Sequence, residues 1–151
     1  MSDLKNKLQS DLNDAIKSRN TVVAETIRMV LAAITNEEVA GKEKKELSDA
    51  EVITVLTREA KKRREAAEAF EQGGRADKAE TERAEGEVIA GYLPEQLSEA
   101  EIKKLIEETI AAVGASGPAD MGKVMGALKA KVAGKADGAM VSSLVKAALN
   151  K

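Results

Sequence analysis

Apolar residues recur every three or four positions along almost the whole chain of 151 residues. Leu4, Leu8 and Leu12 begin the first such stretch, and Val23–Ile34 forms the second. This spacing places apolar side chains on one face of an α-helix, whereas a half-buried strand needs strict alternation. The chain also has only 2 prolines and few β-branched runs, which disfavours a sheet protein. We therefore predict an all-α fold.

Helix ends are marked by capping residues and by glycines. Ser48 and Glu51 stand three residues apart before an apolar stretch, which is the spacing of a capping box. Ser98 and Glu101 repeat this spacing. The helix after Ser48 is expected to be long and to end at Gly73–Gly74, because glycine favours the C-terminal end of a helix.

A short linker is expected at residues 92–97, because Pro94 cannot continue a helix and restrains Leu93. Four helices are predicted before it, at residues 4–16, 23–34, 48–73 and 77–90. Three shorter helices are predicted after it, at residues 102–113, 121–132 and 140–148. The chain is therefore interpreted as an N-terminal four-helix domain over residues 1–92 and a small C-terminal three-helix domain over residues 93–151.

The composition excludes most of the side chains on which enzymatic catalysis commonly depends. The chain has no histidine and no cysteine, so it offers no imidazole base, no thiolate nucleophile and no zinc ligands of those types. The glutamates between Glu80 and Glu87 alternate around their expected helix instead of converging. The glycines at Gly122 and Gly126 lack the spacing of a phosphate-binding loop. We expect no enzymatic activity, no cofactor and no metal.

Two features bear on location. The first residues lack the apolar segment of a signal peptide. The longest apolar run, Met29–Ile34, is far shorter than the roughly 20 residues of a membrane-spanning helix. With no cysteine and no export signal, the chain is expected in the cytoplasm and not in a membrane. Its oligomeric state and the angle between the two predicted domains stay open.

Positive charge gathers at the end of a chain whose net charge is −2. The last 31 residues hold six lysines against Asp137 as the one acidic residue. These lysines are Lys123, Lys129, Lys131, Lys135, Lys146 and Lys151. A basic segment on an acidic protein suits contact with phosphate groups, but from the charge pattern alone we favour lysines that only keep a small helical domain in solution. Aromatic residues make up only 1% of the chain, so stacking of RNA bases on aromatic side chains is not expected.

A second basic cluster lies in the predicted third helix. Its members are Arg58, Lys61, Lys62, Arg63 and Arg64. Glutamates follow four residues after Lys61 and after Arg64, so most of this cluster is interpreted as a solvated face with weak helix support. Arg63 falls on the apolar side, where it would either reach solvent with its head group or pair with a carboxylate of a neighbouring helix.

Short segments in a fixed order carry a resemblance to a known family. They are Ala15-Ile16-Lys17, Ile27–Ile34, Glu59–Arg64, Gly74-Arg75-Ala76-Asp77, Glu87-Val88-Ile89, Tyr92-Leu93-Pro94, Asp120–Met125, Gly134–Gly138, Val141 and Val145-Lys146. Each segment alone is weak, but their order and spacing together are specific. On these segments the chain resembles the YqeY family, which shares a domain with the GatB subunit of tRNA-dependent amidotransferases.

The resemblance implies an N-terminal helical bundle and a C-terminal domain of three helices. In GatB that domain is a tail that helps to hold tRNA, while glutamine hydrolysis and transamidation occur elsewhere in the complex. It therefore implies contact with tRNA and no catalysis. The positions that match the tail signature are Gly122, Lys123, Met125, Gly134, Lys135, Ala136 and Asp137. The chain departs from it at Gly126, where tails carry a basic residue, and at Asp137-Gly138, where they carry Asn-Pro. The acidic residue argues against close phosphate contact at that point.

Two groups of site residues follow from charge and resemblance. The candidate RNA-binding residues are Lys123, Lys129, Lys131 and Lys135. The candidates for close backbone approach are Gly122, Met125, Gly134, Ala136 and Asp137. Gly122 and Gly126 share a helix face, so they either let a ligand's backbone approach or, as we favour, let two helices pack tightly. If the four lysines neutralise about four phosphates, affinity should fall with salt at a log–log slope near −3 to −4.

Three functions are weighed on these grounds. The first is an accessory module without catalysis that binds tRNA, with a tRNA-aminoacylation or amidotransferase enzyme as a further partner. The second is a helical module that regulates a protein partner without touching RNA, for which an exposed apolar groove near Tyr92 and Leu93 is expected. The third, an amidotransferase that acts alone, is disfavoured by the composition. We favour the first.

Overall fold

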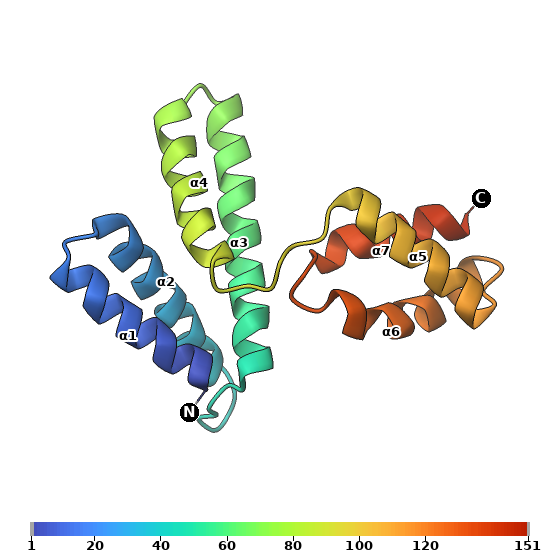
Figure 1. Ribbon diagram of the computed structural model, residues 1–151, viewed down its shortest axis with the longest axis horizontal. Helices are drawn as coiled ribbons and strands as arrows, with labels where there is room; N and C mark the ends of the chain where they lie inside the picture. Colours follow the sequence, from blue (N-terminus) through green and yellow to red (C-terminus); the bar gives the residue numbers. More distant parts are fainter. Residues whose placement is uncertain (1, 151) are drawn as a thin grey trace. The chain divides into compact units, whose positions relative to one another are not determined.

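The computed structural model describes residues 2–150 and divides the chain into two compact units, Met1–Leu93 and Pro94–Lys151. Seven α-helices and one short 3₁₀ helix make up the regular structure of the described residues, which contain no strand (Figure 1). The prediction of an all-α fold is therefore confirmed. The unit Met1–Leu93 is called the N-terminal unit below, and Pro94–Lys151 the C-terminal unit.

Four helices form the N-terminal unit. They are α1 (Asp3–Lys17), α2 (Thr21–Glu38), α3 (Asp49–Gln72) and α4 (Ala76–Ala90). Helices α1 and α2 form one antiparallel hairpin, and α3 and α4 form a second (Figure 1). Helix α2 runs one turn further than its apolar stretch predicted, to Glu38, because that carboxylate is held at the helix end by tertiary contacts described below.

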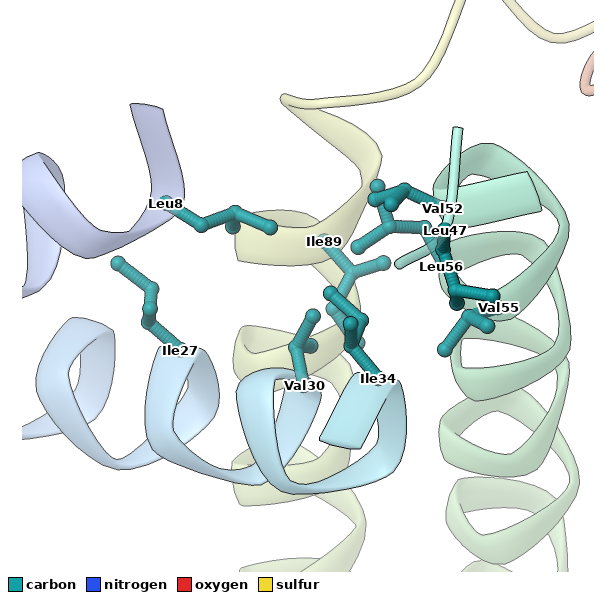
Figure 2. Packing of buried hydrophobic residues seen from close by; sticks show 9 residues of the cluster. All are labelled: Leu8, Ile27, Val30, Ile34, Leu47, Val52, Val55, Leu56 and Ile89. Carbon is teal, nitrogen blue, oxygen red and sulfur yellow. The ribbon is translucent and has the colours of Figure 1, made fainter. Parts of the chain in front are cut away.

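The core of the N-terminal unit lies where the two hairpins meet. Its buried residues are Leu8, Ile27, Val30, Ile34, Leu47, Val52, Val55, Leu56 and Ile89 (Figure 2). Every one of the four helices contributes to this set, and Leu47 comes from the loop before α3. Burial of each such large side chain contributes about 1.5–3 kcal/mol to folding. The core therefore holds the two hairpins together as one unit.

A buried ion pair fastens the loop between α2 and α3. The Glu38 carboxylate accepts a hydrogen bond from Lys5 Nζ at 2.8 Å and another from the backbone N–H of Leu47 at 3.3 Å. The backbone N–H of Lys45 donates to the Glu38 carbonyl oxygen at 2.9 Å. The bond from Lys5 holds the pKa of Glu38 below its ordinary value of 4.5. Helix α1, the end of α2 and the loop are thus tied to one carboxylate.

The end of the N-terminal unit is tied back to α1 by Tyr92. Its hydroxyl donates a hydrogen bond to the Asp11 carboxylate, and Lys7 Nζ lies 5.6 Å from the centre of its ring. The hydrogen bond from Tyr92 lowers the pKa of Asp11. Burial, together with this same bond, raises the pKa of Tyr92. Tyr92 and Leu93 both pack against the core of this unit, so these two residues of the Tyr92-Leu93-Pro94 segment have a structural role.

Three helices form the C-terminal unit around a separate core. They are α5 (Glu99–Val113), α6 (Met121–Val132) and α7 (Gly138–Leu149), with the 3₁₀ helix Pro118–Asp120 before α6. The buried residues are Ile102, Ile106, Val124, Leu128, Val132, Ala136, Val141, Val145 and Leu149. Each helix supplies a stripe at the spacing of three and four residues that the sequence predicted.

The two predicted capping motifs form to different degrees. At the start of α5, the Ser98 hydroxyl accepts from the Glu101 amide and the Glu101 carboxylate accepts from the Ser98 amide, so the capping box is complete. At the start of α3, Ser48 accepts from the Glu51 amide at 3.2 Å. The Glu51 carboxylate there also pairs with Lys45 at 2.9 Å.

Candidate nucleic-acid interface

The four lysines proposed for RNA contact lie on one helix and the turn after it. Lys123, Lys129 and Lys131 belong to α6, and Lys135 lies in the turn that leads to α7. All four are exposed, and none forms an ion pair within residues 2–150. Lys123 lies near enough to Asp120 to lower its pKa slightly, although the main cause of that shift is the Ser116 backbone N–H, which donates to Asp120 at 2.9 Å. Lys146 is also exposed, and Lys151 lies outside the described residues.

The lysines of α6 do not share one face. Val124, Leu128 and Val132 are its buried residues and mark the side that packs on the core. At about 100° per residue, Lys129 and Lys131 then stand about 160° apart, on opposite flanks of the buried side. Lys123 lies about 80° from Lys131, two turns away along the axis. The basic surface therefore wraps around α6, and a flat stretch of ligand would meet three of the four lysines at most.

The turn after α6 is held rigidly by the residues that precede α5. Gly134 adopts the left-handed conformation with φ of 72°, and its carbonyl accepts from Gln96 Nε2 at 2.7 Å. The carbonyl of Lys135 accepts from the Leu97 amide at 2.8 Å. The segment is therefore a helix-to-helix turn with a glycine at its left-handed position. The side chain of Lys135 is thereby presented on a fixed turn.

Three other residues of the tail signature have roles in the fold. Ala136 is buried in the core of the C-terminal unit, and Met125 packs against that core. The Asp137 carboxylate caps α7 by accepting from the Ala139 amide at 3.2 Å. Asp137 therefore uses its charge at a helix N-terminus, where a negative group is stabilised by the helix dipole. Whether any of them approaches a ligand's backbone stays a prediction.

Gly122 and Gly126 lie on a bare face of α6. A Cβ atom added at either position would meet no atom within 4 Å apart from its own helix and chain neighbours. The interpretation that these glycines let two helices pack tightly is therefore wrong for the helices of the C-terminal unit. Both are exposed and both lie within a helix, where glycine is unfavourable relative to alanine by roughly 0.5–1 kcal/mol.

The second basic cluster is largely neutralised by carboxylates within its own unit. Arg58 pairs with Glu37 at 3.2 Å and Lys62 with Glu59 at 3.2 Å. Arg63 reaches α4, where its NH1 atom lies 3.2 Å from Glu82.

Arg63 also lies 3.4 Å from the Glu85 carboxylate. Of the two positions considered for its head group, the pairing with a neighbouring helix is confirmed. Lys61 pairs with Glu65 at 3.9 Å, one of the two spacings that predicted helix support. The cluster thus serves α3 and its neighbours, and it offers little free positive charge.

The aromatic side chains are also engaged within the N-terminal unit. Lys78 Nζ lies 5.5 Å from the centre of the Phe70 ring, and Lys7 Nζ lies over the Tyr92 ring.

Residues 2–150 hold no group of three acidic side chains close enough to bind a metal ion. None of the described helices combines the length and apolar character that crossing a bilayer requires.

The family model described as "Yqey-like protein" matches residues 5–149. The chain belongs to this family. The resemblance found in the short segments is therefore confirmed over nearly the whole chain. The match includes α6, the turn at Gly134 and the linker segment at Tyr92, so the structural roles described above are those of a YqeY-like protein.

Curated relatives of this YqeY-like protein come from fungi. One, from Pyrenophora tritici-repentis, is named altered inheritance of mitochondria protein 41, mitochondrial, and is 30% identical over 133 residues, which cover 86% of this chain and 71% of the relative. An uncharacterised protein of Schizosaccharomyces pombe is 36% identical over 92 residues, or 60% of this chain and 72% of the relative. A protein of Clavispora lusitaniae with the same name as the first is 36% identical over 90 residues, or 60% of this chain and 51% of its own length.

Proposed function

We propose that this YqeY-like protein is an accessory module that binds tRNA through α6 and the turn after it and that has no catalytic activity of its own. The observation that carries the proposal is the set of exposed lysines Lys123, Lys129, Lys131 and Lys135. They are without ion pairs in the part of the chain that the structure describes. Unpaired cations near one another are the usual means by which a protein neutralises nucleic-acid phosphates.

Recognition would depend on the backbone and shape of the RNA. The two aromatic side chains, Phe70 and Tyr92, already contact lysines of the N-terminal unit and are not placed as stacking platforms. Gly126 leaves the backbone of α6 bare between the lysines, so a phosphate-sugar backbone could approach more closely than any side chain would allow. The resemblance of the C-terminal segments to the tail domain of GatB is the ground for choosing tRNA as the class of RNA.

The position of the lysines also revises the expected salt dependence. Because Lys129 and Lys131 lie on opposite flanks of α6, about three phosphates would be neutralised at once instead of four. The log–log slope of affinity against salt is then about −2 to −3. The proposal of a further partner, an enzyme of tRNA aminoacylation or amidotransfer, rests on the family resemblance. A cytoplasmic location stays a prediction, and the names of two relatives, which refer to mitochondria, do not support it.

The test is binding of the full chain to total tRNA, with a DNA duplex of similar charge as competitor. A double variant, Lys123→Ala with Lys131→Ala, removes two charges that lie on the same side of α6. The matched control is Lys103→Ala with Lys104→Ala, which removes two exposed charges from α5 in the same unit.

We expect the α6 variant to weaken tRNA binding about tenfold at low salt and to make the salt slope shallower by about 2. The α5 control should stay within about twofold of the unchanged chain. Equal losses in both variants would mean that tRNA senses only net charge, and the proposed surface would be wrong. Glutamine hydrolysis by the purified chain would overturn the absence of catalysis.

A further inference from the structure

An apolar groove of about 690 Å³ runs between α5 and α7 in the C-terminal unit. Its main lining residues are Ile106, Ile110, Ala111, Leu144, Ala147 and Ala148. Ile106 belongs to the buried core, whereas Ala111 and Ala147 are exposed on the two walls. The groove therefore lies over the buried residue Ile106, between helices α5 and α7, which contact each other.

The length of the groove along α5 suits a helix, and its lining has few of the polar groups that a small polar ligand needs. Along α5 it extends from Lys103 to Gly114, which is about 16 Å or three helical turns. Pockets for small polar ligands have several polar groups that converge on one point. The charged side chains of this groove, Lys103 and Glu107, both stand on the α5 wall one turn apart. The α7 side of the groove is shorter, from Leu144 to Ala148. An apolar groove between two helices suits the apolar face of a third, with anchors three and four residues apart.

The charged side chains at the rim of the groove indicate which charge a docked helix should carry. Lys103 pairs with Glu99 at 3.3 Å, so its charge is already balanced. Glu107 forms no ion pair with any residue that the structure describes, which leaves one negative charge on the α5 wall. The α7 wall is formed by Leu144, Ala147 and Ala148 and is uncharged. A complementary helix therefore carries a lysine or arginine beside its apolar face.

We propose that the α5–α7 groove docks an amphipathic helix of a protein partner, about three turns long, whose apolar face fills the groove and whose basic flank pairs with Glu107. Helix α6 contributes no residue to the lining, so the lysines proposed for tRNA contact are separate from this surface. The C-terminal unit could then hold RNA and a protein partner at the same time. An experiment that disproves tRNA binding at α6 would therefore not bear on docking in the groove, and the reverse is also true.

The groove can be probed with a synthetic 18-residue helical peptide. It has leucines at positions i, i+3, i+4 and i+7 and lysines on both flanks, and a second peptide has glutamates in place of the lysines. Binding to the full chain is followed by the methyl NMR signals of Ile106, Ile110 and Leu144. We expect saturable shifts at these methyl groups and an affinity for the lysine peptide about two- to fivefold higher than for the glutamate peptide.

Two pairs of variants separate docking in the groove from attraction to the surface in general. Ala111→Glu puts a charge on the α5 wall and should weaken binding at least about tenfold, because the apolar face of the peptide would cover it. Ala112→Glu adds the same charge at an exposed position outside the groove and should leave binding unchanged. Glu107→Lys should reverse the preference between the peptides, and Glu108→Lys should not.

Other outcomes would overturn the proposal. Equal loss in Ala111→Glu and Ala112→Glu, or an unchanged peptide preference in Glu107→Lys, would show that the peptide does not occupy the groove as proposed. Absence of saturable shifts would exclude docking of such a helix. Shifts of the same methyl groups with protein concentration alone would assign the groove to a second copy of this chain.

Discussion

Gly126→Ala tests whether the exposed side of α6 is as bare as the structure shows. Gly126 lies in the middle of this helix, and a Cβ atom there would meet nothing within 4 Å. Alanine is favoured over glycine in an exposed helix interior by about 0.8–1 kcal/mol, through both the unfolded chain and better shielding of the backbone. With no contact to offset this gain, the substitution should stabilise the C-terminal unit by nearly that whole amount.

The gain is large enough to measure in thermal unfolding. One kcal/mol corresponds to a rise in Tm of about 4–8 °C for a unit of this size that unfolds by itself. If the whole chain unfolds together, the rise is about 2–4 °C. Circular dichroism at the helix band follows the transition, since the chain has no tryptophan and one tyrosine in the other unit. Gly114→Ala is the control, because Gly114 has φ of 68° and alanine there should lower stability by about 1 kcal/mol.

The same variant separates folding from function. If Gly126 is kept bare so that an RNA backbone can approach, Gly126→Ala should weaken tRNA binding while it raises Tm. A lowered or unchanged Tm would refute the reasoning, because it would mean that this face of α6 contacts something that a methyl group disturbs. A raised Tm with unchanged tRNA binding would keep the structural argument and remove Gly126 from the proposed interface.

Substitutions at three positions test the N-terminal unit, each by urea unfolding of the full chain. Glu38→Ala should lose about 2–3 kcal/mol, somewhat less than a fully buried pair, since Lys5 can turn to solvent. The ion pair with Lys5 lowers the Glu38 pKa below 4.5, so the contribution of the pair to stability is present above that pH and is lost as the pH falls. The unchanged chain should therefore lose stability more steeply than Glu38→Gln between pH 5 and pH 3. Tyr92→Phe keeps the ring but removes the bond to Asp11 and should cost about 1 kcal/mol, with a rise in the Asp11 pKa by NMR; no change in either would contradict the contact. Arg19→Gly should stabilise by about 0.5–1 kcal/mol because Arg19 has φ of 58°, and destabilisation would show that its side chain matters more than its backbone.

Local patterns predicted the helices because their signals are local. The spacing of Val124, Leu128 and Val132 indicates which face of α6 is buried. The pair Ser98 and Glu101 indicates where α5 begins. Such features depend on residues within a turn or two of each other. They can therefore be obtained from the sequence without knowing how the helices pack.

Features that depend on packing between helices could only be posed as alternatives. Whether Arg63 reached solvent or a neighbouring helix depended on how α3 and α4 align, and the structure places Glu82 beside it. The role of Gly126 was misjudged because i, i+4 spacing does not say which face another helix covers. The apolar groove expected between the two domains near Tyr92 and Leu93 stays a prediction, because only the packing of both residues on the N-terminal core is observed. The α5–α7 groove was not expected, because it depends on how much of the apolar face of α5 is left uncovered by α7.

The central claim is that α6 presents free lysines to tRNA, and the salt dependence of tRNA binding tests it most directly. The full chain and the Lys123→Ala, Lys131→Ala variant should be titrated with tRNA at several salt concentrations beside the Lys103→Ala, Lys104→Ala control. We expect a slope of about −2 to −3 for the unchanged chain and the control, and a slope near −1 or weaker for the α6 variant. The same slope in all three proteins, or no preference for tRNA over the DNA duplex, would contradict the claim.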